Sequence, residues 1–570
     1  MKNRTITVFI SSLIIASMAA GCGYQQPDTS SSYTPTSEAR TSKAVMSPSA
    51  PAADTYGADN ETENYYDVTA CETEEYLSTD CVQMPLATTI EIPGYAEPEW
   101  NTEEYSYEEE NPFCLVKTAP FSTFAADVDT ASYANVRRMI LDGDTVIPDA
   151  VRAEEMISYF HYDYAEPGSG DPFGVTTELA PCPWNEAAKL LLIGLQAEKL
   201  DTREMPVSNL VFLIDVSGSM SDHNKLPLVK RSFMTLVENL SAEDRVTLIT
   251  YADGEEILCD GIKGSEKAEI MSHLESLEAG GATDGQHALE MAYEAAEKHF
   301  VEGGNNRIIL ATDGDFNVGI TSEGDLTRYI KKKTSSGICL SVLGYGMGNY
   351  KDNKMEAIAD NGNGNYYYID DISEARKVLV EEAGGTLFTV AKDVKLQVEF
   401  NPVMVKGYRL IGYENRAMAA EDFSDDTKDG GELGAGHQIT ALYEIIPVDS
   451  DYPIPEIESR YNTSADDSSV SAADENYNEW LTLKIRCKKP DSDVSALFEY
   501  PVDSSAVRYD MSDNMSWAAG VAQTAMLLKD SSYKGTSTYA EVKDRLKSIA
   551  DDDYRVEFIY LLTRLGASHS

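Results

Sequence analysis

Basic residues are scarce in this chain of 570 residues. Lys and Arg number 46 against 96 Asp and Glu, which gives a net charge of −50. Nucleic acid is therefore not an expected partner, because its phosphates would be repelled, and an anionic membrane surface would repel the folded body for the same reason. The length allows about three domains, each with its own core.

Cysteine and histidine are too few and too scattered for the common metal and nucleophile motifs. None of the 8 cysteines lies in a CxxC pair, and none of the 7 histidines forms HExxH or an evident Ser-His-Asp set. Asp127 and Asp129 hint at a phosphatase-type pair, but Ala131 stands where Thr or Val is expected. We therefore predict no catalytic residue and a protein that is not an enzyme.

Long apolar runs are absent after the first two dozen residues, and none approaches the roughly 18 to 20 residues of a membrane span. At the start, Lys2 and Arg4 precede the apolar stretch Ile6 to Met18, and small residues precede Cys22. This pattern predicts a secretory signal peptide at residues 1–21. It resembles the bacterial lipoprotein kind, in which Cys22 carries the lipid, although Ala19 stands where that family prefers Leu. An ordinary signal peptide is the alternative.

Residues 22–113 lack the aliphatic content of a folded domain. No Lys or Arg occurs from Asp54 to Phe113, where acidic residues alternate with Tyr. Self-repulsion without a core predicts a disordered acidic tether. The alternative is an acidic, tyrosine-rich tail that folds on a partner.

Residues 207–384 alternate between buried-strand and helix patterns. Leu210 to Ile214 and Ile308 to Thr312 are continuous apolar runs, typical of parallel strands covered on both faces. Leu226 to Leu240 carries a helical stripe, and a helix opening at Thr283 is expected to point Phe300 inward. Repeated βα units predict an α/β domain with a doubly wound, mostly parallel sheet.

The flanking segments follow other patterns. Residues 114–206 predict two helices broken near Pro148 and then strands. Residues 385–508 show the two-residue alternation of a β-sandwich, and residues 509–570 predict helices. We infer that the strands before and after the central domain pair in one sandwich, with the doubly wound domain inserted in a loop and the terminal helices packed together. Independent flanking domains are the alternative.

Five side chains that carry oxygen follow strands of the central domain. Asp215, Ser217 and Ser219 come directly after Leu210 to Ile214, Asp313 comes after Ile308 to Thr312, and Thr283 lies in a glycine-rich loop. Two carboxylates and three hydroxyls are ligands for a hard divalent cation. So few charges would leave the ion able to accept a carboxylate from another molecule. The alternative is that these residues only cap helices and close turns.

The DxSxS run, the Thr and the Asp, in this order, resemble the metal-ion-dependent adhesion site of von Willebrand factor type A domains. The resemblance implies a Rossmann-like domain over about residues 209–370. It also implies metal coordination by Asp215, Ser217, Ser219, Thr283 and Asp313, directly or through water. Mg²⁺ is expected, with Mn²⁺ and Ca²⁺ as alternatives.

The flanks carry a narrower resemblance. Asp127-Val128-Asp129-Thr130-Ala131-Ser132-Tyr133 and Gly434-Ala435-Gly436-His437 resemble secreted, often lipid-anchored bacterial von Willebrand factor A proteins with a C-terminal domain of unknown function. We therefore predict a membrane-anchored lipoprotein of the bacterial cell envelope, outside the cytoplasm. It would bind a protein ligand that presents Asp or Glu, for adhesion or complex assembly, and no small-molecule substrate. A metal-assisted extracytoplasmic hydrolase is the alternative function.

Overall fold

The computed structural model describes residues 101–168, 170–200, 205–283, 287–314, 323–455, 478–490, 492 and 494–568. The predicted signal peptide, Cys22 and most of the predicted tether lie outside the described residues. Within the described ranges, none of the helices combines the length and the apolarity that a bilayer crossing requires.

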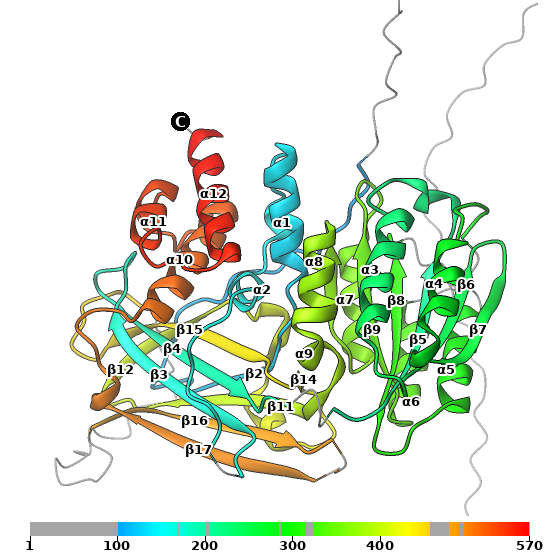
Figure 1. Cartoon of the computed structure of the whole chain (residues 1–570). Coiled ribbons are helices and arrows are strands. Elements are labelled where there is room, and N and C mark those ends of the chain that lie inside the picture. The colour runs from blue at the N-terminus through cyan, green and yellow to red at the C-terminus, as the bar shows by residue number, and fades with distance from the viewer. Residues whose placement is uncertain are drawn as a thin grey trace, which may run out of the picture. The chain divides into compact units, whose positions relative to one another are not determined.

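The central domain contains a six-stranded sheet, shown in green in Figure 1. Its order is β10-β9-β8-β5-β6-β7, and all neighbours are parallel except β6 and β7. The strands are β5 (Ser208–Asp215), β6 (Arg245–Tyr251), β7 (Glu255–Lys263), β8 (Asn305–Thr312), β9 (Cys339–Tyr345) and β10 (Tyr366–Ile369). Every residue of β5 and β8 is buried, because helices cover both faces of the sheet. The predicted doubly wound α/β fold is confirmed.

Alternate residues of β5 face different helices. Leu210, Phe212 and Ile214 pack in one core with α3 (Leu226–Asn239), α4 (Lys267–Glu275) and α8 (Ile372–Arg376). Val211 and Leu213 pack in a second core with α5 (Ala288–Lys298), α6 (Glu323–Thr334) and α7 (Asp352–Asn361). The period of two along a strand thus divides the apolar run between two layers of helices.

Two local expectations for this domain were wrong. Helix α5 begins at Ala288 rather than at Thr283, and it ends at Lys298. Phe300 lies beyond that end and is 41% exposed instead of pointing inward. The helical periodicity therefore continues in the sequence past the point where the helix stops.

The flanking strands form two sheets. One has the strand order β1-β12-β15-β4-β3, and the other has the order β13-β2-β11-β16-β17 with β14 paired to β11 as a sixth strand. Strand β4 (Lys189–Ala197) precedes the central domain and pairs with β15 (Gln438–Pro447), which follows it. Strand β2 (Phe121–Ala125) likewise pairs with β11 (Thr389–Phe400). The remaining strands are β1 (Cys114–Leu115), β3 (Phe173–Pro181), β12 (Val405–Ile411), β13 (Ala417–Met418), β14 (Gly431–Gly434, paired with β11), β16 (Glu479–Lys488) and β17 (Ser495–Asp503). The inference that the central domain is inserted in one sandwich is confirmed.

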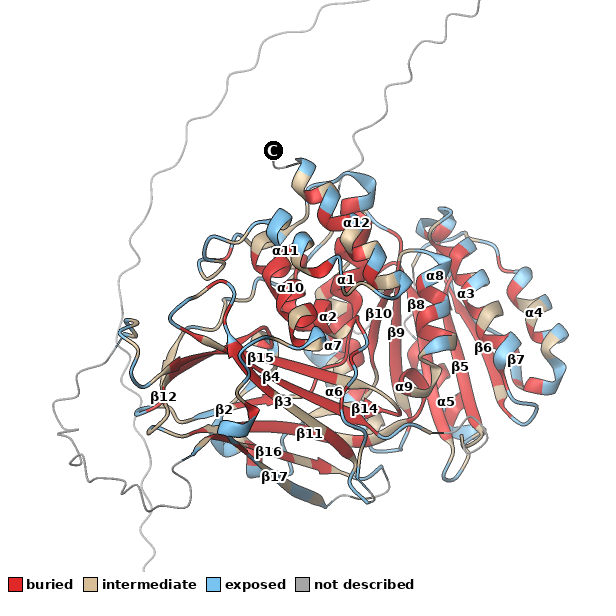
Figure 2. Ribbon diagram, turned by 60° about the vertical axis from the view of Figure 1, so that its left-hand side comes forward, coloured by how far each residue is buried: buried red, intermediate tan, exposed pale blue. Residues whose placement is uncertain are grey.

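Helices cover the outer face of the β4-containing sheet (Figure 2). Leu191, Ile193 and Leu195 of β4 face the interior of the sandwich. Leu190 and Leu192 face a layer made of α2 (Ala153–Ser158), α10 (Asp513–Leu528), α11 (Tyr539–Leu546) and α12 (Asp553–Ser568). Helix α2 contacts α10, and α1 (Ala131–Asp142) contacts α12, so the N- and C-terminal helices pack together as predicted.

Residues 101–113 do not continue the predicted tether, because they lie on the folded body. The Thr102 N–H donates to the Gly348 carbonyl at 2.6 Å, and the Glu104 N–H donates to the Tyr350 carbonyl at 2.9 Å. The Glu104 carbonyl in turn accepts from the Asp352 N–H at 3.1 Å. Backbone pairing with the loop between β9 and α7 therefore holds residues 101–105 on the body despite their charge. We call residues 101–105 the strap.

Candidate metal site

Asp215 is the last residue of β5 and is fully buried. Its Oδ1 accepts a hydrogen bond from the Ser217 N–H at 2.9 Å. Its Oδ2 accepts from the Tyr251 hydroxyl at 3.1 Å and from the Thr312 hydroxyl at 3.2 Å. These two donors are the last residues of β6 and β8, so three adjacent parallel strands fix one carboxylate at the same edge of the sheet.

Ser217 and Ser219 follow Asp215 in a tight turn, η2 (Gly218–Ser221). Their hydroxyl oxygens lie 3.1 Å apart. Ser217 is buried and Ser219 is exposed. The pair therefore leads from the buried carboxylate to solvent, where an ion could keep water or meet another molecule.

Thr283 is brought toward this turn by the glycine-rich loop before it. The Gly218 N–H donates to the Gly281 carbonyl at 3.0 Å, and the Gly280 N–H donates to the Val216 carbonyl at 2.8 Å. Asp253, which follows β6, accepts from the Ala282 N–H at 2.6 Å. The half-buried Thr283 thus follows a segment held against the DxSxS turn by its own backbone.

Gly281 is required at its position in this loop. Its φ is +81°, in the left-handed region, and a Cβ there would lie 2.6 Å from Asp253 Oδ2. Any other residue would therefore move either Asp253 or the loop that leads to Thr283.

Asp313 directly follows β8 and is fully buried. Its Oδ2 accepts from the Lys225 ammonium at 2.9 Å and from the Asn349 side-chain amide at 3.0 Å. The Lys225 ammonium also donates to Asn349 Oδ1 at 2.9 Å. Lys225 and Asn349 belong to the site, and sequence reasoning missed both because neither follows a strand end in a recognisable motif.

The site concentrates negative charge in a dry place. The pKa of Asp215 is raised to about 6, chiefly by burial and also by the nearby Asp313 carboxylate, while hydrogen bonds from Ser217 and Tyr251 oppose the rise. A cation beside Asp215 would offset this cost, because an opposite charge favours the ionised form.

The donor chemistry fits a hard divalent ion. Asp215, Ser217, Ser219 and Asp313 offer only oxygen, which suits Mg²⁺, Mn²⁺ or Ca²⁺ rather than softer metals. Across the described part of the chain, no group of three or more His, Cys, Asp or Glu could hold a metal. An ion in this site would accordingly depend on hydroxyls and water as well as on the two carboxylates.

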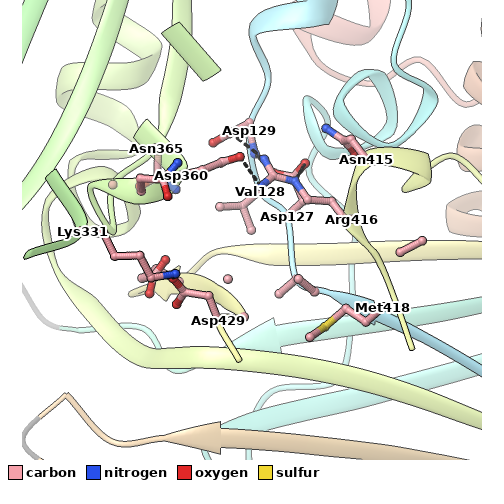
Figure 3. Close-up of a pocket in the computed structure, with 18 residues that line it drawn as sticks. Asp127, Val128, Asp129, Lys331, Asp360, Asn365, Asn415, Arg416, Met418 and Asp429 are labelled. Carbon is pink, nitrogen blue, oxygen red and sulfur yellow. Dashed lines mark hydrogen bonds and ion pairs between the residues drawn. The ribbon is translucent and has the colours of Figure 1, made fainter. Parts of the chain in front are cut away.

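The other acidic pair singled out in the sequence, Asp127 and Asp129, lies elsewhere. Both line a cavity of about 310 Å³ between the sandwich and the central domain (Figure 3). The Arg416 guanidinium reaches Asp127 at 3.1 Å, Asp129 at 3.5 Å and Asp360 of α7 at 2.7 Å. Burial raises the pKa of Asp129 well above its usual range, with Asp127 adding to the rise and Arg416 opposing it. The pair binds an arginine that joins two parts of the fold.

The sheet order and the position of the oxygen-bearing loops are those of a von Willebrand factor type A domain. The family model described as "von Willebrand factor type A domain" matches residues 209–381, and one described as "von Willebrand factor" matches residues 99–192. A model described as "Uncharacterized protein YfbK, C-terminal" matches residues 385–567. Domains of the type A family commonly bind proteins through a metal-ion-dependent adhesion site.

Relatives place the chain more narrowly. It is 43% identical over 486 residues to the protein named YfbK of Escherichia coli K12, which covers 84% of this chain and 82% of the relative. The chain therefore belongs to the family of bacterial von Willebrand factor A proteins with a YfbK-type C-terminal domain.

Other similarities are confined to parts of the chain. The inter-alpha-trypsin inhibitor heavy chain H4 of Homo sapiens is 30% identical over 147 residues, covering 24% of this chain and 16% of the relative. Among solved structures, a von Willebrand factor type A protein from Catenulispora acidiphila matches 71% of this chain and 91% of its own at 14% identity and a TM-score of 0.38. A mussel byssus matrix protein, described with a zinc-occupied MIDAS motif, matches 31% of this chain and 45% of its own at 20% identity and a TM-score of 0.26.

Proposed function

We propose that this protein is a metal-dependent protein-binding module of the bacterial cell envelope, which acts in adhesion or in complex assembly. A divalent ion, Mg²⁺ in the first instance, is held by Asp215, Ser217, Ser219, Thr283 and Asp313. The open position of the ion receives an Asp or Glu carboxylate of a partner protein. Binding rather than catalysis is the proposed activity.

The observation that carries this proposal is the meeting of three loops at one edge of the sheet. Strand order reverses between β5 and β8, and ligands of doubly wound sheets bind at such a point, beyond the carboxyl ends of the strands. Asp215 ends β5 and Asp313 directly follows β8, and the loop before Thr283 is hydrogen-bonded to the turn that follows β5. The exposed Ser219 gives the site its opening.

The proposed location rests on the N-terminal sequence. A charged start, an apolar stretch and Cys22 support export and lipid attachment, which would leave the folded body outside the cytoplasm. With a net charge of −50, the body itself has little attraction for anionic lipids. The membrane contact is accordingly assigned to the lipid.

A metal-assisted hydrolase is the competing function, since a bound ion also activates water. Such a reaction needs a base within hydrogen-bonding reach of that water. Two charged neighbours of the site are already engaged: the Lys225 ammonium donates to Asp313, and Asp253 accepts from the Ala282 N–H in the loop before Thr283. This arrangement favours binding over hydrolysis.

The proposal is tested with the double variant Ser217→Ala and Ser219→Ala. It removes two hydroxyl ligands without altering charge and keeps the backbone N–H of residue 217 for Asp215. Ser221→Ala, in the same exposed turn, is the matched control. We expect Mg²⁺ to raise the thermal midpoint of wild type and control and not that of the double variant, and capture of envelope proteins to require Mg²⁺ in the same way. Equal responses of all three proteins, or metal-dependent turnover of phosphoester or peptide substrates, would overturn it.

A further inference from the structure

The cation already inside the site is the ammonium of Lys225. Lys225 is 4% exposed and stands at the N-cap of α3. Its ammonium lies 2.9 Å from Asp313 Oδ2 and 2.9 Å from Asn349 Oδ1. A buried lysine in hydrogen-bonding contact with one of the two carboxylates of the site must influence how that site holds any other cation.

The fold builds a slot for this side chain. Gly346 follows β9 with a φ of +77°, and a Cβ at Gly346 would lie 2.4 Å from Lys225 Cε and 2.5 Å from Lys225 Cγ. The Gly346 carbonyl is itself held by the Tyr368 hydroxyl at 2.6 Å. The lysine stem therefore passes over a fixed backbone that has no side chain, and this directs its ammonium to Asp313.

Charge at the site changes sign with the ion. Asp215, Asp313 and Lys225 together carry one net negative charge, and a divalent ion would change this to one net positive charge. Without Lys225 the loaded site would be neutral. A positive loaded site attracts an anionic ligand, and the same positive charge makes the ion itself easier to lose.

We propose that Lys225 tunes the metal site in two ways. Its positive charge weakens the binding of the ion, and it leaves the loaded site positive toward a carboxylate ligand. This inference rests on the proposed metal-dependent function and deepens it. The ion and the partner's carboxylate then depend on one another: the ion stays in place best when an anion completes its coordination.

Lys225→Met, of similar length but uncharged, tests the inference, and Lys225→Gln provides a second neutral variant that keeps a polar end for Asp313 and Asn349. Lys230→Met is the matched control on the same helix, since the Lys230 ammonium donates to the carbonyls of Glu275 and Leu277 instead. The probes are Mn²⁺ alone, followed by electron paramagnetic resonance, and then acetate added to the Mn²⁺-loaded protein, followed by water-proton relaxation.

We expect both Lys225 variants to bind Mn²⁺ at least about tenfold more tightly than wild type, because one repelling charge is gone. They should also need several-fold more acetate to displace water from the ion. A lysine that only supports the fold would give the opposite sign, with metal affinity lowered in the variants.

The two failures are distinguishable. Wild type that binds Mn²⁺ while the Lys225 variants bind it equally or more weakly would overturn the role of Lys225 and leave the proposed function standing. Wild type that binds no Mn²⁺ at the site would overturn the proposed function itself.

Discussion

Asp215→Asn should make the metal-free protein more stable while abolishing its response to metal. Asparagine keeps an oxygen to accept from the Ser217 N–H at the position of Oδ1. Its amide replaces Oδ2, and the hydroxyls of Tyr251 and Thr312, which donate to Oδ2 in the wild type, can turn to accept from it. The substitution thus removes a buried charge and leaves the hydrogen bonds in place.

The size of the effect follows from the raised pKa. The pKa of Asp215 rises from 3.8 to about 6 in the folded protein, chiefly because of burial. An acid shifted upward on folding costs stability once it is ionised: the cost is absent below pH 3.8, grows as the pH rises to about 6, and is full above that. For this shift the full cost is about 3 kcal/mol. In the presence of chelator, we expect the variant to exceed wild type by about 2 to 3 kcal/mol at pH 8 and to match it near pH 3.5.

The assay is chemical denaturation with chelator across this pH range, followed by thermal unfolding at pH 8 with Mg²⁺. Asp222→Asn, an exposed carboxylate of the neighbouring turn, is the matched control and should change neither quantity. A variant less stable than wild type at pH 8 without metal would refute the account of Asp215 as a buried carboxylate whose charge lowers the stability of the metal-free protein. A variant that still gains stability from Mg²⁺ would refute its role as a ligand.

Three further substitutions test other parts of the fold. Arg416→Met should lower the free energy of unfolding, measured by chemical denaturation, by about 3 to 5 kcal/mol, because it leaves buried carboxylates without their guanidinium. The surface control Arg328→Met should lower it by less than about 0.5 kcal/mol. Equal losses in the two variants would refute this expectation. The pKa of Glu154 in α2 is raised to about 8, chiefly by burial. Between pH 4.5 and 8 this carboxyl ionises in the unfolded chain but stays protonated in the folded chain, so the thermal midpoint of wild type should fall relative to that of Glu154→Gln. Parallel pH profiles of the two proteins would contradict a raised pKa at Glu154. Thr102→Pro removes the N–H that donates to the Gly348 carbonyl, so it should lower the free energy of unfolding by about 1 kcal/mol and make the strap (residues 101–105) accessible to protease. Unchanged cleavage would argue against the strap.

The sequence alone predicts the central domain well because its signals are local and strong. Leu210 to Ile214 is apolar throughout, and that occurs where helices cover both faces of a strand. The edge strand β7 was missed because only Cys259 and Gly261 of its residues are buried, so it lacks both a continuous apolar run and a clean alternation. The strap was assigned to the tether because its contacts are made by backbone atoms, which composition does not report.

Some residues of the candidate site could likewise be predicted from the sequence, and others could not. Asp215, Ser217 and Asp313 could be placed at one sheet edge because each lies at or just beyond the end of a parallel strand. Tyr251 could have been added by the same rule, as the last residue of β6. Lys225 and Asn349 lie on other loops, 88 and 36 residues away from Asp313 in sequence. Only the folded chain brings them to its carboxylate.

The most direct measurement is a crystal structure grown with Mn²⁺, with an anomalous map recorded at the manganese edge. We predict one strong peak at the C-terminal edge of the central sheet, within about 2.5 Å of the hydroxyl oxygens of Ser217 and Ser219. A map with no peak there, from crystals in which Ser217 and Ser219 are well ordered, would contradict the claim that these loops hold a metal ion.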